Sequence, residues 1–273
     1  MNPSDASPRD LFAAAPLLLG VVHLLPLPGS PRAAADLKEV VEAAASDANA
    51  LIEGGMDGFI VENFGDAPFH RDRVEPITVA AMARITTELR ARVGGEPIIG
   101  VNVLRNDAHS ALAVAAAAGA DLVRVNVHTG AMLTDQGWIE GKAAETLRTR
   151  EVIGARSVRI AADIGVKHAL RPAGFSAAES ARETVGRGLA DAVIVTGVAT
   201  GAAADRAELE EVRAALPDTP LLVGSGATAG TIAGLLEVAS GVIVGTTLKQ
   251  DGALAKPVDV GRVRAFVAAA RGS

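Results

Sequence analysis

The sequence contains no cysteine, which excludes disulfide bonds, cysteine nucleophiles, iron–sulfur clusters and thiolate metal sites. Aromatic residues make up only 3% of the chain, too few for the stacking platforms that bind single-stranded nucleic acids. Lysine and arginine number 26 against 32 aspartate and glutamate residues, a net charge of −6, and no basic run occurs. Nucleic acid is therefore excluded as an expected partner, because its main electrostatic attraction would be missing.

The sequence also predicts no membrane-spanning segment. The apolar stretch from Leu11 to Val22 is far shorter than the roughly 20 residues that cross a bilayer. It also lacks the marks of a signal peptide, since Arg9 is followed by an acidic residue, Pro16 interrupts the run and no small-residue cleavage site follows. We therefore expect a buried strand here, preceded by an N-terminal extension over residues 1–16. The protein is expected to be cytoplasmic, without direct membrane insertion.

Short aliphatic runs alternate with longer segments rich in alanine, glutamate and arginine along the whole chain. Each run is rich in valine and isoleucine and bounded by glycine, proline or aspartate, as buried parallel strands are. The runs are LLLGVVHL from Leu17, DGFIVENF from Asp57, PIIGVNVL from Pro97, DLVRVNVH from Asp121, RIAADIGV from Arg159, DAVIVTGV from Asp191, PLLVGSGA from Pro220 and GVIVGTTL from Gly241.

The segments between the runs carry apolar residues at helical spacing. They are Asp36–Glu53, Ile77–Arg92, Ala108–Ala118, Ala143–Ile153, Ala177–Leu189, Arg206–Leu216, Ala229–Val238 and Val260–Ala270, and an irregular segment, Thr129–Lys142, precedes the fourth. Eight β-then-α units in roughly 255 residues match a TIM (β/α)8 barrel, so we predict that fold as a single domain over residues 1–273. An open doubly wound sheet is the alternative, which the unit count and the absence of a GxGxxG motif after the first run disfavour.

Polar residues interrupt the strands near their carboxyl ends, where a barrel builds its active site. Arg124, Asn126 and His128 share one face of their strand by the period of two, as do Asp163 and Lys167 on the next. The other positions are His23, Glu62, Asn102 and Thr196. A polar layer that merely holds the barrel together is the alternative, but ionised groups in a lumen are costly unless they are paired or used.

Two glycine-containing loops follow the last two predicted strands. The first contains Gly224, Ser225 and Gly226, and the second contains Gly245 and Thr246. Glycine permits close approach of the backbone to a phosphate group, and barrels frequently bind phosphate after strands seven and eight. These loops therefore predict a phosphate site, with ordinary tight turns as the alternative.

Three further signals are weaker. The proline-rich loop His23–Arg32 is a candidate wall of the pocket, and Met132–Gly141, which contains the only tryptophan, is either a lid or a structural excursion or an oligomer contact. A divalent cation is a candidate cofactor, with oxygen and nitrogen ligands from His23, Glu62, His128 and Asp163. No closely spaced ligand pair supports it, so the sequence requires no cofactor.

Several long segments resemble the BtpA/SgcQ family. They include HLLPLPGSPR from His23, DGFIVENFGDAPF from Asp57, GVNVLRND from Gly100, RVNVHTGAMLTDQGWIEGKAAETLR from Arg124, DIGVKHA from Asp163, DAVIVTGVATG from Asp191, LLVGSGAT from Leu221 and VIVGTTLKQDG from Val242. The resemblance implies a ribulose-phosphate-binding type of barrel. The family is named for a role in photosystem I biogenesis in cyanobacteria, and its wider distribution makes that role a poor general function. Gly165 departs from the family pattern, so a side-chain role at that position is excluded.

These observations predict an enzyme that acts on a phosphorylated sugar or a nucleotide-derived phosphate, with isomerase, epimerase, lyase or glycosyl hydrolase chemistry. Glu62 and Asp163 would be the acid/base pair, while Arg124 and Lys167 would stabilise developing negative charge. His23, Asn102, Asn126, His128 and Thr196 would contact the substrate. A Schiff base at Lys167 and a non-catalytic biogenesis or stability factor for a membrane complex are the alternatives. The protein is expected to form a homo-oligomer.

Overall fold

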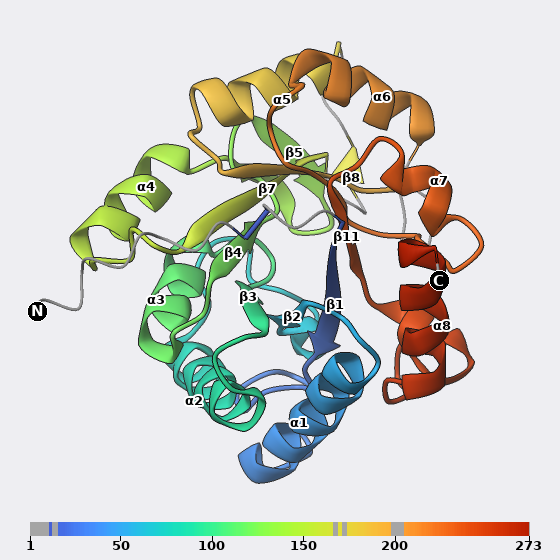
Figure 1. The fold of residues 1–273 in the computed structure, drawn as a ribbon. Coiled ribbons are helices and arrows are strands. Elements are labelled where there is room, and N and C mark those ends of the chain that lie inside the picture. The colour runs from blue at the N-terminus through green and yellow to red at the C-terminus, as the bar shows by residue number, and fades with distance from the viewer. Residues whose placement is uncertain (1–10, 13–15, 166–168, 171–173, 198–204, 273) are drawn as a thin grey trace, which may run out of the picture.

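Eight parallel strands close into a ring in this computed structural model, which describes residues 11–12, 16–165, 169–170, 174–197 and 205–272 (Figure 1). The strands are β1 (Leu17–His23), β2 (Gly58–Glu62), β3 (Ile98–Asn102), β4 (Leu122–Val125), β7 (Arg159–Gly165), β9 (Ala192–Val195), β10 (Leu221–Val223) and β11 (Gly241–Val244). Around the ring their order is β1-β11-β10-β9-β7-β4-β3-β2. The predicted TIM barrel is confirmed.

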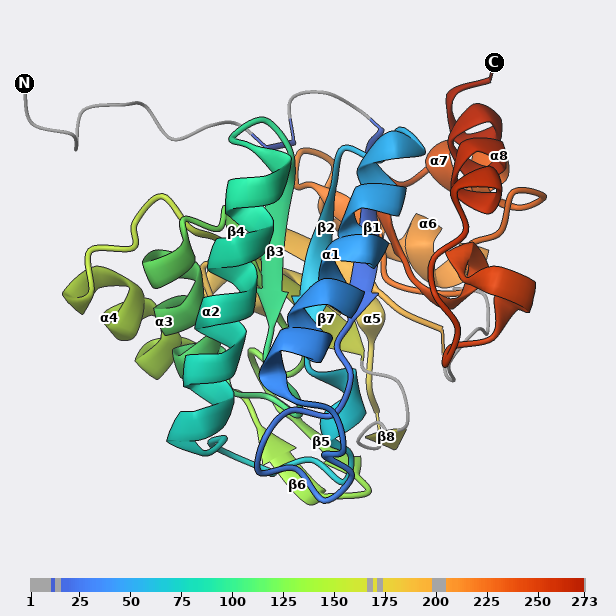
Figure 2. The ribbon, with the colours of Figure 1, turned by 90° about the horizontal axis from the view of Figure 1, so that it is seen from below.

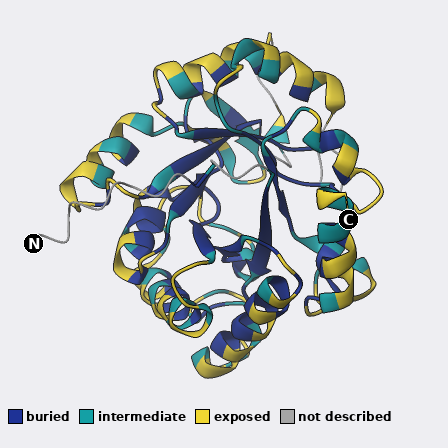
Figure 3. Ribbon diagram, viewed as in Figure 1, coloured by how far each residue is buried: buried dark blue, intermediate teal, exposed yellow. Residues whose placement is uncertain are grey.

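Helices cover the outside of this ring, and their buried stripes face the strands (Figure 3). They are α1 (Leu37–Glu53), α2 (Pro76–Val93), α3 (Ala108–Ala118), α4 (Ala143–Val152), α5 (Ala177–Gly186), α6 (Arg206–Ala215), α7 (Ile232–Leu236) and α8 (Val260–Arg271). Aspartate or serine side chains cap the amino ends of several of them, as Asp36 does for α1 and Asp107 for α3. The helices therefore begin where short polar residues satisfy the first free N–H groups.

One helix is much shorter than its sequence pattern predicted. The segment Ala229–Val238 is helical only over α7, because Thr231 accepts the N–H of Thr228 through its hydroxyl group and Thr228 in turn accepts the N–H of Thr231. Such local bonds compete with helix formation. The turn they form precedes the helix and lengthens the loop that follows β10.

Inward-facing residues divide the lumen into an apolar half and a polar half. Toward the amino ends of the strands the lumen is filled by aliphatic residues, among them Leu19, Ile60 and Ile243. Leu11 is buried against this cluster and Phe12 packs beside it. The amino end of the barrel is thereby closed, so the accessible polar half lies at the carboxyl ends of the strands.

The amino ends of the strands are joined in pairs by a repeated arrangement, which we call the amino-end clamps. In each clamp the side chain of the residue directly before one strand accepts a hydrogen bond from a backbone N–H of the neighbouring strand. The same side chain also binds an arginine from an even-numbered helix. The acceptors and arginines of the four clamps in the described chain are Asp57 with Arg271, Asp121 with Arg90, Asp191 with Arg150, and Ser240 with Arg213. The barrel is thus held as four strand pairs, each tied to the last turn or end of a helix.

The predicted irregular segment Thr129–Lys142 is ordered instead. It forms a hairpin of β5 (Ala131–Thr134) and β6 (Gly137–Glu140), and β8 (Ala169–Leu170) adds a third antiparallel strand. Met132 and Ile139, which pair across its two strands, are buried against Val127 and stabilise the hairpin through apolar contact. The strand arrows point toward the end of the barrel at which this small sheet lies (Figure 2).

Removal of one clamp should destabilise the barrel measurably. We expect Asp191→Ala to lower the free energy of unfolding by about 2 kcal/mol, because Ile160 N–H and Arg150 each lose a charged partner. For a domain of this size the thermal midpoint falls by about 4–8 °C. The control is Glu140→Ala at an exposed position outside the clamps, and circular dichroism melting curves compare the two. Equal midpoints for both variants would show that the clamps contribute nothing.

Candidate functional site

A cavity of about 430 Å³ opens at the carboxyl end of the barrel. Most of the side chains predicted to form a site line it: His23, Glu62, Arg124, Asn126, Gly224, Ser225, Gly226, Gly245 and Thr246. The residues come from opposite sides of the ring and from distant parts of the chain. Their convergence follows from the parallel strands, which all end at this one edge.

Arg124 and Asp163 form a buried ion pair, in which Arg124 lines the cavity and Asp163 lies behind it. The Nε and Nη2 groups of Arg124 donate to the two carboxylate oxygens of Asp163 over 3.1 and 3.0 Å, and Asn126 Nδ2 donates to Oδ2 over 2.8 Å. The Asp163 side chain has no exposed surface and that of Arg124 is 6% exposed. Burial disfavours the charged guanidinium, but Asp163 and Glu62 outweigh it and raise the pKa of Arg124 above its usual value. Arg124 therefore presents a permanent positive charge to the cavity.

Glu62 is the carboxylate that reaches the cavity from within the ring. His23, Glu62 and Asn102 stand in register on the neighbouring strands β1, β2 and β3. Asn102 Nδ2 donates to Glu62 Oε2 over 2.7 Å, which fixes the carboxylate, while Oε1 receives no hydrogen bond from the described part of the chain. One oxygen of Glu62 is thus oriented and the other remains available.

Aromatic rings form the wall beside Glu62. Phe64 lies edge-on to the His23 ring at 5.3 Å between centroids, and the Phe69 ring lies 6.4 Å from that of Phe64. Both phenylalanines line the cavity. Of the proline-rich loop His23–Arg32, only His23 is part of the cavity wall. A bound molecule would therefore contact an apolar surface next to the available carboxylate oxygen.

The two glycine-containing loops follow the neighbouring strands β10 and β11 and also line the cavity. A Cβ atom on Gly224 would come within 2.3 Å of Thr196 Cγ2, and one on Gly245 within 2.5 Å of His23 Cε1. These two glycines are therefore required by packing, whatever binds above them. The backbone N–H groups of Ser225, Gly226, Thr246 and Thr247 donate to no atom among the described residues, so they are available to an anion.

Some predicted site residues lie behind the cavity wall or elsewhere. Asn102, Asp163 and Thr196 support the lining, the last through a hydrogen bond from its hydroxyl group to Gly165 O. Lys167 lies outside the described residues.

His128 is displaced from the other residues. Its Nε2 atom is 2.8 Å from Gly188 O, and burial lowers the pKa of the imidazole despite this contact. The strand β4 ends at Val125, so the alternation used in the prediction no longer applies at residue 128. The ring packs toward the end of α5 rather than into the lumen.

The proposed ligand set for a divalent cation is consequently not assembled. His128 is absent from the cavity wall, and Asp163 is engaged by Arg124 and Asn126. Within the described ranges no group of three or more histidine, aspartate or glutamate side chains is arranged to hold a metal ion.

Arg105 and Asp135 are cavity residues that the sequence patterns did not identify. Arg105 follows β3 by three positions and is 8% exposed, and Asp135 lies in the turn of the β5–β6 hairpin. Burial lowers the pKa of Arg105, and the nearby carboxylates, chiefly Asp135, only partly oppose this effect. Both residues follow strand ends, where no periodicity marks the direction of a side chain.

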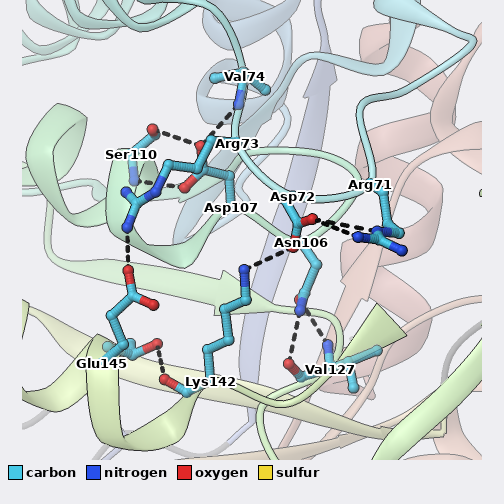
Figure 4. Close-up of polar contacts among 11 residues, drawn as sticks. Arg71, Asp72, Arg73, Val74, Asn106, Asp107, Ser110, Val127, Lys142 and Glu145 are labelled. Atoms are coloured by element: carbon cyan, nitrogen blue, oxygen red, sulfur yellow. Dashed lines mark hydrogen bonds and ion pairs between the residues drawn. The ribbon is translucent and has the colours of Figure 1, made fainter. Parts of the chain in front are cut away.

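The loops around the cavity are tied to one another by polar contacts (Figure 4). Asn106 exchanges two hydrogen bonds of 2.8 Å with the backbone of Val127, and Asp107 Oδ2 accepts the N–H of Val74 over 2.9 Å. Lys142 Nζ donates to Asp72 over 2.7 Å. The loop after β2, the loop after β3 and the start of α4 are thereby linked to one another.

Comparison with known proteins places the chain among relatives of similar length. The family model described as "BtpA family" matches residues 15–272. "Photosystem I biogenesis protein BtpA" of Synechocystis sp. is 49% identical over 253 residues, covering 92% of this chain and 87% of that protein. An uncharacterized protein of Archaeoglobus fulgidus is 45% identical over 255 residues, covering 93% and 98%.

Solved structures with the same fold are more distant in sequence. Phosphoribosyl anthranilate isomerase from Thermus thermophilus superposes with a TM-score of 0.56 at 11% identity, covering 94% of this chain and 98% of that one. KGPDC from Streptococcus mutans in complex with ribose 5-phosphate gives 0.54 at 15% identity, with coverage of 94% and 98%. Identities this low show the shared barrel alone. Within the described residues no helix combines the length and apolar character that crossing a bilayer requires.

His128 should make the free energy of unfolding depend on pH. The folded-state pKa of His128 is lowered, so below the ordinary value of 6.5 the unfolded chain binds a proton that the folded protein does not. The contribution of His128 to the free energy of unfolding is therefore fully present above pH 6.5 and is lost as the pH falls toward the folded-state pKa. We expect His128→Gln, which keeps a donor for Gly188, to lose less stability than the wild type between about pH 7 and 5. Urea unfolding at several pH values measures the free energy of unfolding of both proteins. Parallel pH profiles would contradict the lowered pKa of His128.

Proposed function

The chain belongs to the BtpA family, and we propose that it binds a phosphorylated sugar or a nucleotide-derived phosphate at the carboxyl end of its barrel and acts on it by acid/base chemistry. One observation carries the proposal. The same cavity is lined by two loops with available N–H groups and by the side chains of Glu62 and Arg124. A phosphate held at the loops would direct the rest of the molecule across the mouth toward the carboxylate.

The phosphate would bind through backbone groups and hydroxyls. The N–H groups of Ser225, Gly226, Thr246 and Thr247 are suited to this because their glycine-containing loops let a ligand approach the backbone closely. Two proteins with the same barrel, phosphoribosyl anthranilate isomerase and KGPDC in complex with ribose 5-phosphate, are named with phosphorylated sugars, and the proposal takes the same ligand class.

Glu62 is proposed as the group that moves a proton. Its oriented carboxylate lies at the cavity surface, next to the permanent charge of Arg124, which would stabilise negative charge that develops on the substrate. Asp163, predicted as the second acid/base residue, is better placed as a positioning residue, because its two oxygens are occupied by Arg124 and Asn126. Proton transfer at one carboxylate favours isomerase, epimerase or lyase chemistry over glycosyl hydrolysis, which uses two.

A non-catalytic role in biogenesis of a membrane complex is the second candidate. It is favoured by the name of the Synechocystis relative. A scaffold that acts through its outer surface has no use for a cavity lined by Glu62 and two arginines, since buried charge is costly to maintain. The relative from an archaeon also suits a function that is not confined to photosystem assembly.

Ligand binding should raise the thermal midpoint. A screen of sugar phosphates, nucleotides and inorganic phosphate, with and without Mg²⁺ or Mn²⁺, should include at least one compound that stabilises the protein. At 100 times its dissociation constant a ligand adds about 2.7 kcal/mol, which corresponds to about 5–10 °C. The matched control is the dephosphorylated form of each sugar phosphate and nucleotide, which should give no shift. Absence of any shift with phosphorylated compounds would contradict the proposal and favour a protein partner.

Loss of the proposed proton-transfer group should separate catalysis from binding. We expect Glu62→Gln to reduce turnover of the ligand found in the screen by about 100-fold or more, because general acid/base groups contribute that much. The ligand-induced thermal shift should persist, since the phosphate loops are unchanged. Glu140→Gln, an exposed position on the hairpin, is the control. Wild-type turnover in Glu62→Gln would show that another group carries the proton.

A further inference from the structure

Two phenylalanine rings line the cavity, although the chain has few aromatic residues. The sequence contains six phenylalanines, one tryptophan and no tyrosine. Phe64 and Phe69 line the cavity and neither is fully buried, whereas Phe59 and Phe266 are buried in the core. A partly exposed ring forgoes part of the free energy that full burial in the core would supply. The position of these two rings therefore calls for a reason beyond packing.

The aromatic wall begins at the glycine-containing loop after β11. A Cβ atom on Gly245 would lie 2.5 Å from His23 Cε1, so the His23 ring packs directly against this loop. Phe64 comes next along the wall, at 5.3 Å between ring centroids, and the Phe69 ring lies 6.4 Å from that of Phe64. The strands β11, β1 and β2, which lead to these segments, are neighbours in the ring. The wall thus runs without a break from a proposed phosphate loop to two phenylalanines.

Phe64 begins a short turn, η2 (Phe64–Asp66), that is bound to the proline-rich loop. Gly65 N–H donates to Leu24 O over 3.1 Å. The carboxylate of Asp66 accepts the N–H of Leu27 over 2.8 Å. Because these bonds fix the turn, the ring that it carries is held in place before a ligand arrives. A contact with such a ring costs little conformational entropy on binding.

The direction of a bound molecule follows from the order of groups along this wall. Glu62 stands in register with His23 on the neighbouring strand, so the carboxylate lies beside the middle of the path. In a nucleoside 5′-phosphate the phosphate and the base are attached to opposite sides of the sugar. With the phosphate at the loop after β11, the sugar would lie beside His23 and Glu62. The base would then reach the phenylalanine rings, on which it can stack or lie edge-on.

We infer that the ligand of this cavity carries a planar ring on its phosphorylated sugar, as a nucleotide does, and that Phe64 and Phe69 bind this ring. The inference rests on the proposed function, because the phosphate at the loop after β11 sets the direction of the molecule. It selects the nucleotide-derived phosphates from the two proposed ligand classes. A sugar phosphate without the ring leaves the aromatic wall uncovered and binds less tightly.

Isothermal titration calorimetry with three probes tests the inference on the wild-type protein. Ribose 5-phosphate has no ring beyond the sugar, adenosine 5′-monophosphate adds a purine to the same sugar phosphate, and uridine 5′-monophosphate adds a pyrimidine. We expect at least one nucleotide to bind about tenfold or more tightly than ribose 5-phosphate, since stacking of one base on an aromatic side chain contributes about that much. The comparison between the two nucleotides identifies the size of ring that the wall takes.

Three variants complete the test. Phe64→Leu and Phe69→Leu keep an apolar side chain and remove the aromatic ring. Each should weaken binding of the preferred nucleotide by about 3–10-fold and leave the affinity for ribose 5-phosphate unchanged. Phe12→Leu is the matched control, because Phe12 is also partly buried but packs at the amino end of the barrel, and it should change neither affinity. Unchanged nucleotide affinity in both cavity variants would contradict the inference.

The outcomes separate this inference from the proposed function. If ribose 5-phosphate binds and neither nucleotide binds more tightly, the ring inference is wrong and the phosphate site stands. The same holds if Phe64→Leu and Phe69→Leu weaken all three probes equally, because the rings would then contact the sugar or act structurally. If no probe binds, the proposed function fails together with the inference. The comparison of probes on the wild-type protein decides the matter even if a variant does not fold.

Discussion

Side-chain alternation in a closed ring of parallel strands is the constraint on which the rest of this structure depends. Every second residue of each strand points into the lumen, where it meets its counterparts from the other strands. The layers of lumen residues near the amino ends of the strands are aliphatic and close that end of the barrel. Charged lumen residues are therefore confined to the layer near the carboxyl ends of the strands. There the bidentate pair of Arg124 and Asp163 satisfies two charges that could not be buried separately.

The amino-end clamps supply the rigidity that this arrangement requires. Each clamp satisfies a backbone N–H with a side chain and links a strand pair to a helix. The positions of the strands at the amino end of the barrel are therefore set by interactions remote from the cavity. One of these links runs from Arg271 at the end of α8 to Asp57 before β2, and it connects distant parts of the sequence. The stabilising clamps and the cavity thus lie at opposite ends of the same strands, as is usual for barrels.

Much of this could be predicted from the sequence because the period of two is strict within strands. Glu62 and Arg124 were identified by it within strands and Asn126 one position past the end of β4, and the structure brings all three to one cavity. The prediction failed where strands end: His128 lies beyond β4 and turns away, and Arg105 lies beyond β3 and was missed. The direction of such residues is decided by loop contacts such as those of Asn63 and Asn106, which no local pattern encodes.

The β5–β6 hairpin has a consequence for how the protein can be observed. Its outer face carries Trp138, which is 53% exposed and paired across the strands with Leu133. This is the only tryptophan, and the chain contains no tyrosine. The intrinsic fluorescence of the whole molecule therefore originates from one ring on the hairpin whose turn carries Asp135 into the cavity wall. The tryptophan emission spectrum therefore depends only on the surroundings of this hairpin.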